Sequence, residues 1–261
     1  MRSISRVVGC SINTVTKLLV DAGNTCLEFH EAKVQGVKSR RIQCDEIWSF
    51  CYSKQKNVPQ DKQGEAGDVW TWTAIDADSK LICSWMVGDR SAETASYFMQ
   101  DLATRLASRV QLTTDGYAAY LDAVDGAFGV DIDYAMLIKK YGSSPEAEIR
   151  YSPPKVVGCA SANISGDPDE KHVSTSYVER QNLTMRMSMR RFTRLTNAFS
   201  KKLENHVHAL SLYFTYYNFI RVHKSLRVTP AMEAGLIDHL MTFEDLVALI
   251  DEREARLQES N

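Results

Sequence analysis

The 261-residue sequence lacks the features that mark disulfide-stapled, zinc-binding or membrane-spanning proteins. Its six cysteines form no CxxC pair and no short Cys/His cluster, so their spacing favours free thiols over a disulfide framework or a zinc site. They are Cys10, Cys26, Cys44, Cys51, Cys83 and Cys159. No apolar run approaches the roughly 18 residues of a membrane-spanning helix, and the N-terminus has no signal-peptide core. We therefore expect a cytoplasmic protein without a membrane partner.

The sequence also has little net charge, with a formal value of -2 and a pI of about 6.3. That value alone argues against a nucleic-acid partner. The charges are unevenly distributed, however: residues 171–227 hold eleven Lys or Arg against two acidic residues, and residues 228–261 hold eight acidic residues against two Arg. A basic block beside an acidic tail indicates a polyanion-binding face, the alternative being a merely hydrated helix surface.

The N-terminal residues 1–24 show two short helical patterns, the second of which is expected to end at Gly23 and to be capped by Ser11 or Asn13. The pair resembles the last two helices of a helix-turn-helix. Its groove-facing residues would be Asn13, Thr14, Thr16 and Lys17. Because such a unit normally has a preceding helix, either the start is truncated or misassigned, or these helices pack elsewhere. Residues 25–40 are mixed and polar, which predicts a linker.

An α/β pattern follows the linker. Residues 41–53, 69–76 and 81–87 have the composition of strands, and the Asp-Ala-Asp-Ser sequence before the third predicts a tight turn. A helix capped by Ser91, a strand ending at Asp115, a short helix over 117–124 and a fifth strand over 131–138 complete a mixed sheet with flanking helices. Residues 138–174 are rich in Gly and Pro and predict a long functional or disordered loop. Helical patterns then cover 176–191 and 196–219.

Three acidic residues stand where this order of elements would bring them together: Asp45 in the first strand, Asp115 at the end of the fourth, and Glu179 at the start of the helix after the loop. Hard Mg²⁺ prefers carboxylate oxygens, and two such ions stabilise attacking and leaving oxygens in phosphodiester cleavage. Glu46 is expected to point to the opposite face of its strand.

A helical stripe follows the third of these acids. On a helix of 3.6 residues per turn, Glu179, Asn182, Arg186 and Arg190 share one face, which fits a metal ligand followed by a phosphate-binding rail. For Glu179 alone, an ion pair with a nearby arginine is the alternative.

Four strings of the sequence, taken together, are similar to a known enzyme family. CDEIWSF, TTDGYAAY, YVERQNLTMRMSMRR and YYNFIRVHKSLRVTPAMEAG resemble a bacterial insertion-sequence transposase of the DDE type, with a catalytic core like ribonuclease H and retroviral integrase. The similarity covers about residues 40–236. In this family three acidic residues bind the divalent metals, a role that falls by position to Asp45, Asp115 and Glu179.

The resemblance implies a ribonuclease H-like α/β fold, with a mixed five-stranded sheet and flanking helices over 41–195, the helical segment 1–24 before it and a helical extension over 196–261. It implies two Mg²⁺ ions, with Mn²⁺ as a substitute, and no small-molecule cofactor. The partners would be double-stranded DNA, both as element ends and as target, and a second copy of the chain. The protein would be associated with the nucleoid. We expect self-association through the apolar residues of the tail. The expected DNA-binding residues are Asn182, Arg186, Arg190, Arg191, Arg194, Lys201, Lys202, Arg221, His223, Lys224, Asn13, Thr14 and Lys17.

One departure from the family concerns spacing. Asp115 and Glu179 lie 64 positions apart, more than in many members, and the surplus fits an insertion over the long loop. Glu170 and Glu146 are weaker candidates for the third ligand because no basic stripe follows either of them. Two alternatives remain: a ribonuclease H-type nuclease that does not join strands, and a catalytically silent DNA-binding remnant or regulator.

Overall fold

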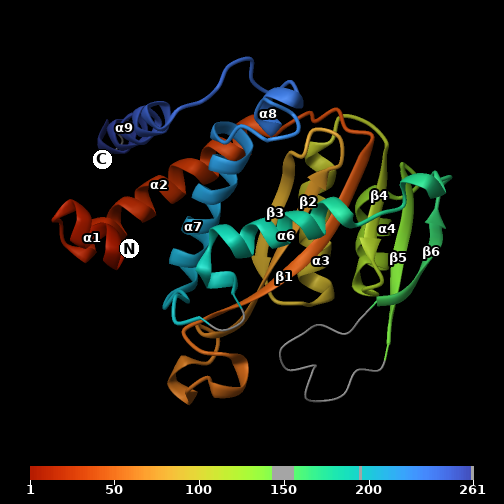
Figure 1. Ribbon diagram of the computed structural model, residues 1–261, viewed down its shortest axis with the longest axis horizontal. Coiled ribbons are helices and arrows are strands. Elements are labelled where there is room, and N and C mark those ends of the chain that lie inside the picture. Colours follow the sequence, from red (N-terminus) through yellow and green to blue (C-terminus); the bar gives the residue numbers. More distant parts are fainter. Residues whose placement is uncertain (143–155, 194–195, 260–261) are drawn as a thin grey trace. The chain divides into compact units, whose positions relative to one another are not determined.

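The computed structural model describes residues 1–142, 156–193 and 196–259. Its central feature is a six-stranded mixed sheet in the order β3-β2-β1-β4-β5-β6 (Figure 1). β4 is parallel to both β1 and β5, whereas β3 is antiparallel to β2, and β6 to β5. The strands are β1 (Arg41–Cys51), β2 (Gly67–Asp76), β3 (Ile82–Gly88), β4 (Val110–Asp115), β5 (Ile132–Tyr141) and β6 (Val156–Ser165). This mixed sheet is consistent with the expected ribonuclease H-like fold.

The sixth strand corrects the expectation of a five-stranded sheet and of an uninterrupted loop over 138–174. β5 continues to Tyr141, and β6 pairs with it along the register from Tyr134↔Ser165 to Tyr141↔Val156. None of the β6 residues is buried, and small residues dominate its sequence, so it carries no apolar pattern that would predict a strand. Glu146 lies outside the described residues, as do the prolines at 145, 153 and 154.

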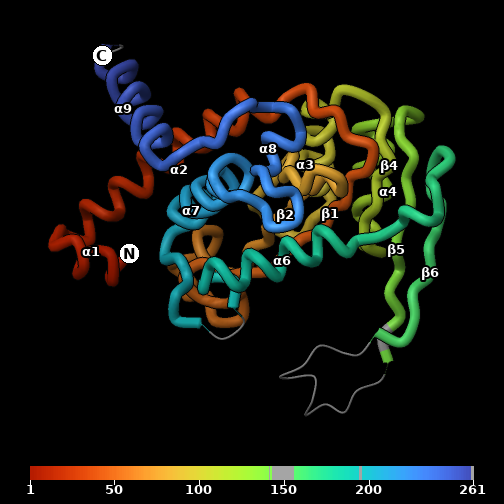
Figure 2. The backbone as a smooth tube through the Cα atoms, turned by 45° about the horizontal axis from the view of Figure 1, so that its top comes forward, coloured from red at the N-terminus to blue at the C-terminus, as the bar shows by residue number. Residues whose placement is uncertain are grey.

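Three helices cover the sheet. α3 (Ala92–Arg105) and α4 (Ala119–Phe128) pack on one face, and α6 (Ser176–Ser188) lies on the other (Figures 1 and 2). As predicted, the hydroxyl of Ser91 caps α3 by accepting a hydrogen bond from the backbone N–H of Thr94 at 3.2 Å. Phe98 and Leu102, four positions apart on this helix, are fully buried and form part of its apolar face.

The remaining helices are α1 (Arg2–Val8), α2 (Ile12–Lys33), α7 (Leu203–Thr215), α8 (Pro230–Glu233) and α9 (Phe243–Glu259). A π-helical turn over Tyr216–Ile220 extends α7. Of the two predicted caps of α2, Ser11 is used, since its side chain accepts from the N–H of Thr14 at 3.1 Å.

The predicted end of α2 at Gly23 is wrong, and so is the linker over its part 25–33, because α2 runs on to Lys33. Gly23 is a contact point between helices and not a stop signal. A Cβ at Gly23 would lie 2.4 Å from the Cβ of His208 on α7, and Ser211 Oγ donates to the carbonyl oxygen of Gly23 at 2.8 Å. The absence of a side chain therefore lets α7 approach α2 closely.

The two predicted C-terminal helices are both shorter than expected. α6 ends at Ser188, and Arg190 belongs to a 3₁₀ turn over Arg190–Phe192. Phe192 is buried with its ring 5.5 Å from that of His206, so the chain leaves the helical path to bury an aromatic side chain. The predicted stripe on α6 therefore stops at Arg186. α7 starts at Leu203 instead of residue 196.

The acidic tail forms α9, whose apolar residues are partly covered within the chain. Leu246 is buried, the ring of Phe243 stacks on Tyr216 at a centroid distance of 6.0 Å, and Arg253 Nε donates to Glu28 Oε1 of α2 at 2.6 Å. Val247 is exposed. Self-association through this helix stays a prediction, with fewer apolar side chains available than the sequence pattern indicates.

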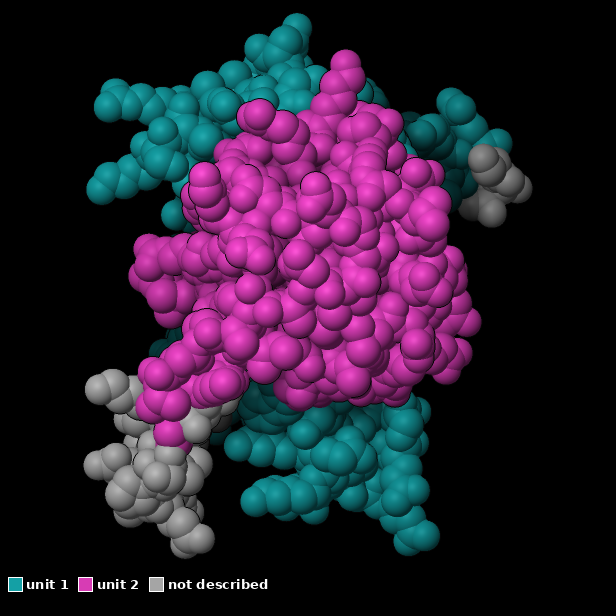
Figure 3. All heavy atoms as spheres, turned by 90° about the vertical axis from the view of Figure 1, so that its right-hand side faces the viewer, with its two compact units in different colours: residues 1–35, 48–69, 189–261 teal, residues 36–47, 70–188 magenta. Residues whose placement is uncertain are grey.

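The chain divides into two compact units, coloured in Figure 3. Unit 1 contains residues 1–35, 48–69 and 189–261, and unit 2 contains residues 36–47 and 70–188. The consecutive blocks expected from the sequence (1–24, 25–40, 41–195 and 196–261) differ from this division, since unit 1 is assembled from three separated segments. All the residues of the candidate active site described next belong to unit 2.

Candidate active site

Two predicted acids meet on neighbouring parallel strands. The register of β1 and β4 pairs Gln43 with Thr113, and continuing it by two residues brings Asp45 beside Asp115. Asp115 is the last residue of β4, and its Oδ1 accepts from the backbone N–H of Tyr117 at 3.0 Å, which fixes the turn after the strand. The expected convergence of the first and fourth strands therefore brings these two carboxylates together.

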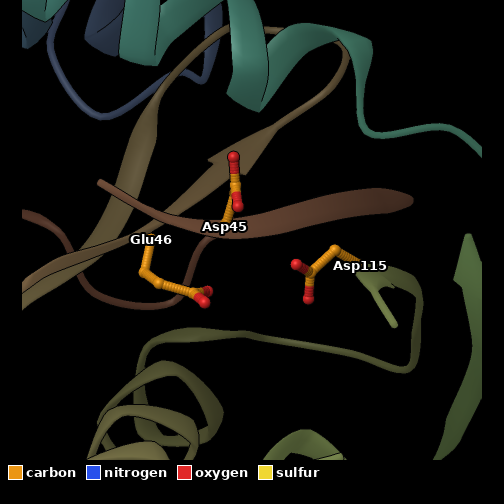
Figure 4. Close-up of side chains that lie close together, drawn as sticks. All are labelled: Asp45, Glu46 and Asp115. Carbon is orange, nitrogen blue, oxygen red and sulfur yellow. The ribbon is translucent and has the colours of Figure 1, made fainter. Parts of the chain in front are cut away.

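Glu46 adds a third carboxylate that the sequence analysis placed away from the site. Figure 4 shows Asp45 and Glu46 leaving β1 in opposite directions, as strand alternation predicts. Nevertheless, Asp45, Glu46 and Asp115 each have an oxygen within 4.8 Å of the others, a spacing that could hold a metal ion. The glutamate has one more methylene group than an aspartate, which lets its carboxylate reach back toward the strand end. The alternation of residues along the strand does not reveal that the Glu46 side chain reaches the site.

Glu179 is positioned by two hydrogen bonds between β1 and α6. The side-chain carbonyl Oε1 of Gln43 accepts from the backbone N–H groups of Tyr177 at 2.8 Å and Val178 at 3.2 Å. These are N–H groups of the first turn of α6, which have no partner inside the helix. Gln43 thereby caps α6. Because Gln43 lies two positions before Asp45 on β1, it also anchors the first turn of α6 near Asp45. The predicted candidate Glu170 lies in a separate 3₁₀ turn over Glu170–His172.

One pocket of about 470 Å³ is lined by all three predicted acids, although Glu179 does not belong to the group of carboxylates whose oxygens lie within 4.8 Å of one another. Its wall includes Asp45 from β1, Asp115 from β4 and Glu179 from α6, together with Arg90 and Lys139. Glu179 is held inside this pocket by an ion pair with Lys139 on β5 and by a hydrogen bond from the hydroxyl of Thr175. The partner of Glu179 is therefore a lysine from a strand, and not the nearby arginine that the sequence suggested as the alternative.

Burial and the neighbouring acids together raise the affinity of Asp45 for a proton. Burial, followed by the negative charges of Glu46, Asp115 and Glu179, raises the pKa of Asp45 to about 7. Burial and the charge of Asp115 also raise the pKa of Glu46, against the opposing effect of Arg90. Carboxyl groups with raised pKa values in a pocket are typical of functional sites.

Asn182 connects α6 to the first acid. Its Nδ2 donates to Asp45 Oδ2 at 2.8 Å, and its buried Oδ1 has no hydrogen-bond partner among the described residues. The asparagine therefore orients the carboxylate of Asp45 and presents an unused acceptor in the protein interior.

The other predicted DNA-binding residues are distributed over both units. Arg186 lies on α6 in unit 2. Those of unit 1 that are exposed are Asn13, Thr14, Lys17, Arg190, Lys201, Lys202, Arg221 and Lys224. His223 is half-buried and bonds Ser225 through Nδ1 at 3.1 Å. Lys17 pairs with Asp21 at 2.8 Å and with Glu254 at 3.6 Å. Arg194 lies outside the described residues.

Arg191 does not fit the expected DNA contact. Its Nη1 donates to Ser200 Oγ at 2.7 Å and to the carbonyl oxygen of Asn205 at 3.4 Å, and burial lowers its pKa. The guanidinium group stabilises the chain around the 3₁₀ turn, so Arg191 is no longer a candidate for DNA contact.

No helix within the described ranges combines the length and apolar composition needed to cross a membrane.

No family model matches the sequence, and no curated protein sequence matches it. Solved structures that are similar to parts of the chain include the following two. A cryo-electron microscopy structure of a simian T-cell lymphotropic virus intasome in complex with PP2A regulatory subunit B56 gamma is 15% identical, covers 77% of this chain and 56% of that chain, and has a TM-score of 0.41. A piggyBac transposase synaptic complex with hairpin DNA is 11% identical, covers 83% and 54%, and has a TM-score of 0.35. The chain spans little more than half the length of each, and this likeness identifies neither its family nor its activity.

Proposed function

We propose that this chain is a DNA transposase of the DDE type, encoded by an insertion sequence. It cuts a phosphodiester bond at each element end and joins the freed 3′-hydroxyl group to target DNA. The observation that carries the proposal is the single pocket lined by Asp45, Asp115 and Glu179, residues that lie far apart in the sequence. The family-like strings that contain these residues support the same function.

The acidic residues of the pocket fit divalent metal ions. We propose Asp45, Asp115 and Glu179 as the ligands, since carboxylate oxygens are what Mg²⁺ and Mn²⁺ bind. Two bound ions would supply the positive charge that stabilises the attacking and leaving oxygens of an in-line displacement at phosphorus. The raised pKa of Asp45 fits the assignment, because a carboxylate that is buried beside Glu46, Asp115 and Glu179 is stabilised in its charged form when a cation lies next to it.

The protein's own residues hold this arrangement. Asn182 fixes the orientation of the Asp45 carboxylate, and Gln43 fixes the first turn of α6 and with it Glu179. Arg186, one turn beyond Asn182 on the same helix, is proposed to bind the DNA backbone. The exposed basic residues of unit 1, with Asn13, Thr14 and His223, are proposed as further contacts to double-stranded DNA. Pairing two element ends requires at least two protomers, so we propose a homo-oligomer.

The test uses the full chain and a plasmid that carries its coding sequence with the native flanking DNA. With Mg²⁺ or Mn²⁺, we expect cleavage at the element ends and joining of labelled ends to a second plasmid. Asp115→Asn should reduce both reactions by more than about 100-fold while DNA binding is retained. Asp122→Asn, at an exposed position on α4, is the matched control for the loss of one charge.

The same assay separates the alternatives. Cleavage without joined product would indicate a nuclease of the ribonuclease H type. Binding of the flanking DNA without cleavage would indicate a silent DNA-binding remnant. Wild-type cleavage by Asp115→Asn would refute the proposed site.

A further inference from the structure

Arg90 is a cation in the wall of the acidic pocket to which the sequence analysis gave no role. It follows the end of β3 and lines the pocket together with Asp45 and Asp115. Its Nε and Nη2 both lie close to Glu46 Oε1, at 2.7 and 2.6 Å, and Nη2 is 4.0 Å from Asp115 Oδ2. The guanidinium group is thus fixed between two carboxylates of the candidate site.

Aromatic rings fix the same guanidinium group. Its Cζ lies 5.0 Å from the ring centroid of Trp70 and 4.2 Å from that of Tyr117, which is within the range of a cation–π interaction. Tyr117 also donates from its hydroxyl to the backbone carbonyl oxygen of Arg90 at 2.7 Å. Both the side chain and the main chain of Arg90 are therefore held in place before any ligand binds.

Glu46 has the contacts of a residue that holds an arginine. Only 2% of its side chain is exposed. Oε1 accepts from Arg90, Oε2 accepts from the hydroxyl of Tyr120 at 3.1 Å, and Glu46 is absent from the residues that line the pocket. Although its oxygens lie near those of Asp45 and Asp115, both are already engaged. A buried carboxylate with these partners is explained by its ion pair and needs no metal.

One edge of the Arg90 guanidinium group remains available. Nη1 makes no hydrogen bond to any residue in the described part of the chain, and 38% of the side chain is exposed. A guanidinium group that is bonded sideways through Nε and Nη2 still presents a planar end of N–H donors, which matches the geometry of a phosphate. Lys139, the other cation of the pocket wall, is paired with Glu179.

We propose that Arg90 binds a non-bridging oxygen of the DNA phosphate that is cut, and that Glu46 positions Arg90 for this contact. The inference rests on the proposed function and adds a residue that touches the substrate. In this arrangement Glu46 binds Arg90 and is not a metal ligand. A phosphate entering a pocket lined by three carboxylates is thereby met by a preorganised donor.

The test compares Arg90→Gln, Arg90→Lys, Glu46→Gln and the double variant E46Q/R90Q in the full chain. Arg40→Gln is the matched control, since it removes one guanidinium group of unit 2 whose side chain is 88% exposed. We expect Arg90→Gln to lower the cleavage rate at saturating DNA by about 100-fold, and Arg90→Lys, which keeps the charge but loses the planar donors, by about 10-fold. Glu46→Gln should lower this rate by about 10-fold, and the double variant should be no slower than Arg90→Gln.

A second measurement does not depend on activity. Mn²⁺ titrated calorimetrically into Glu46→Gln without DNA should bind with a Kd within about threefold of wild type, because Glu46 is not a ligand. Arg90→Gln, which removes a cation 4.0 Å from Asp115, should bind Mn²⁺ at least as tightly as wild type. A loss of Mn²⁺ affinity of about tenfold or more in Glu46→Gln would instead make Glu46 a metal ligand and overturn its assigned role. If a variant does not fold, as judged by its thermal transition, Arg90→Lys and the folded members of the set decide the question.

The failure of this inference is distinguishable from that of the proposed function. If Asp115→Asn abolishes cleavage while Arg90→Gln cleaves at the wild-type rate, the function stands and the phosphate contact is wrong. Additive losses in the double variant would also refute the positioning of Arg90 by Glu46. If the wild-type chain does not cleave DNA at all, both proposals fail together.

Discussion

Asp45 makes the candidate site unstable at neutral pH, and replacing it should therefore stabilise the protein. Its pKa is raised from 3.8 to about 7 in the folded chain, whereas in the unfolded chain it regains its ordinary value. Each pKa unit corresponds to about 1.4 kcal/mol, so ionising this carboxyl group in the folded state costs about 4 kcal/mol at most.

The sign of the pH dependence follows from proton binding. Between pH 3.8 and 7 the folded protein holds a proton on Asp45 that the unfolded chain has released, so the free energy of unfolding falls as the pH rises through this window. Above pH 7 the penalty is fully present and constant. At pH 5 it is about 1.5 kcal/mol, which leaves about 2.5 kcal/mol to appear between pH 5 and pH 8.

Asp45→Asn removes the ionisable group and keeps an oxygen that can accept from Asn182. We expect this variant to be more stable than wild type, and by about 2.5 kcal/mol more at pH 8 than at pH 5. Urea unfolding at the two pH values, in EDTA, measures the difference. Asp122→Asn on α4 controls for the net charge. An equal effect of Asp45→Asn at both pH values would show that the carboxyl is ionised in the folded protein without penalty, contrary to the reasoning.

Two further substitutions test the pocket and the helix packing. Lys139→Met removes the ammonium group that is paired with Glu179 and should strengthen Mn²⁺ binding severalfold in calorimetry, since metal and lysine compete for the same carboxylate; unchanged or weaker binding would contradict this competition. Gly23→Ala places a methyl group 2.4 Å from the Cβ of His208 and should lower the free energy of unfolding by about 2 kcal/mol. Gly126→Ala, with open space around the new methyl group on α4, should leave stability unchanged or raise it by up to about 1 kcal/mol.

The sequence was most informative where a local rule governs the structure. Ser91 caps α3 because a hydroxyl at that position satisfies an N–H group of the first helical turn, and this depends only on nearby residues. The meeting of Asp45 and Asp115 also follows from strand order, since β1 and β4 are parallel neighbours. Hydrophobic periodicity and turn residues predict where these elements start and end, whereas the convergence of the two acids was expected only on the condition that the first and fourth strands are neighbours.

The sequence was least informative where distant residues decide the outcome. Gly23 has the local signature of a helix end, yet it lies inside α2 at the point where this helix packs closely against His208. β6 has no buried face, so the pattern that identifies a strand is missing. Arg90 could not be connected to Glu46 from spacing, because 44 positions separate a residue on β1 from one after β3 and only the folded sheet brings them together.

The amide of Gln43 explains how the chain tolerates a long interval between Asp115 and Glu179. The first turn of α6 is hydrogen-bonded to Gln43 on the strand that bears Asp45. These hydrogen bonds, and not the length of the polypeptide between Asp115 and Glu179, therefore determine where Glu179 lies. The length of that interval can therefore change without moving Glu179. Counting residues between acidic positions is consequently a poor guide to whether such a centre is intact, whereas an amide-bearing side chain two positions ahead of the first aspartate is a feature worth seeking.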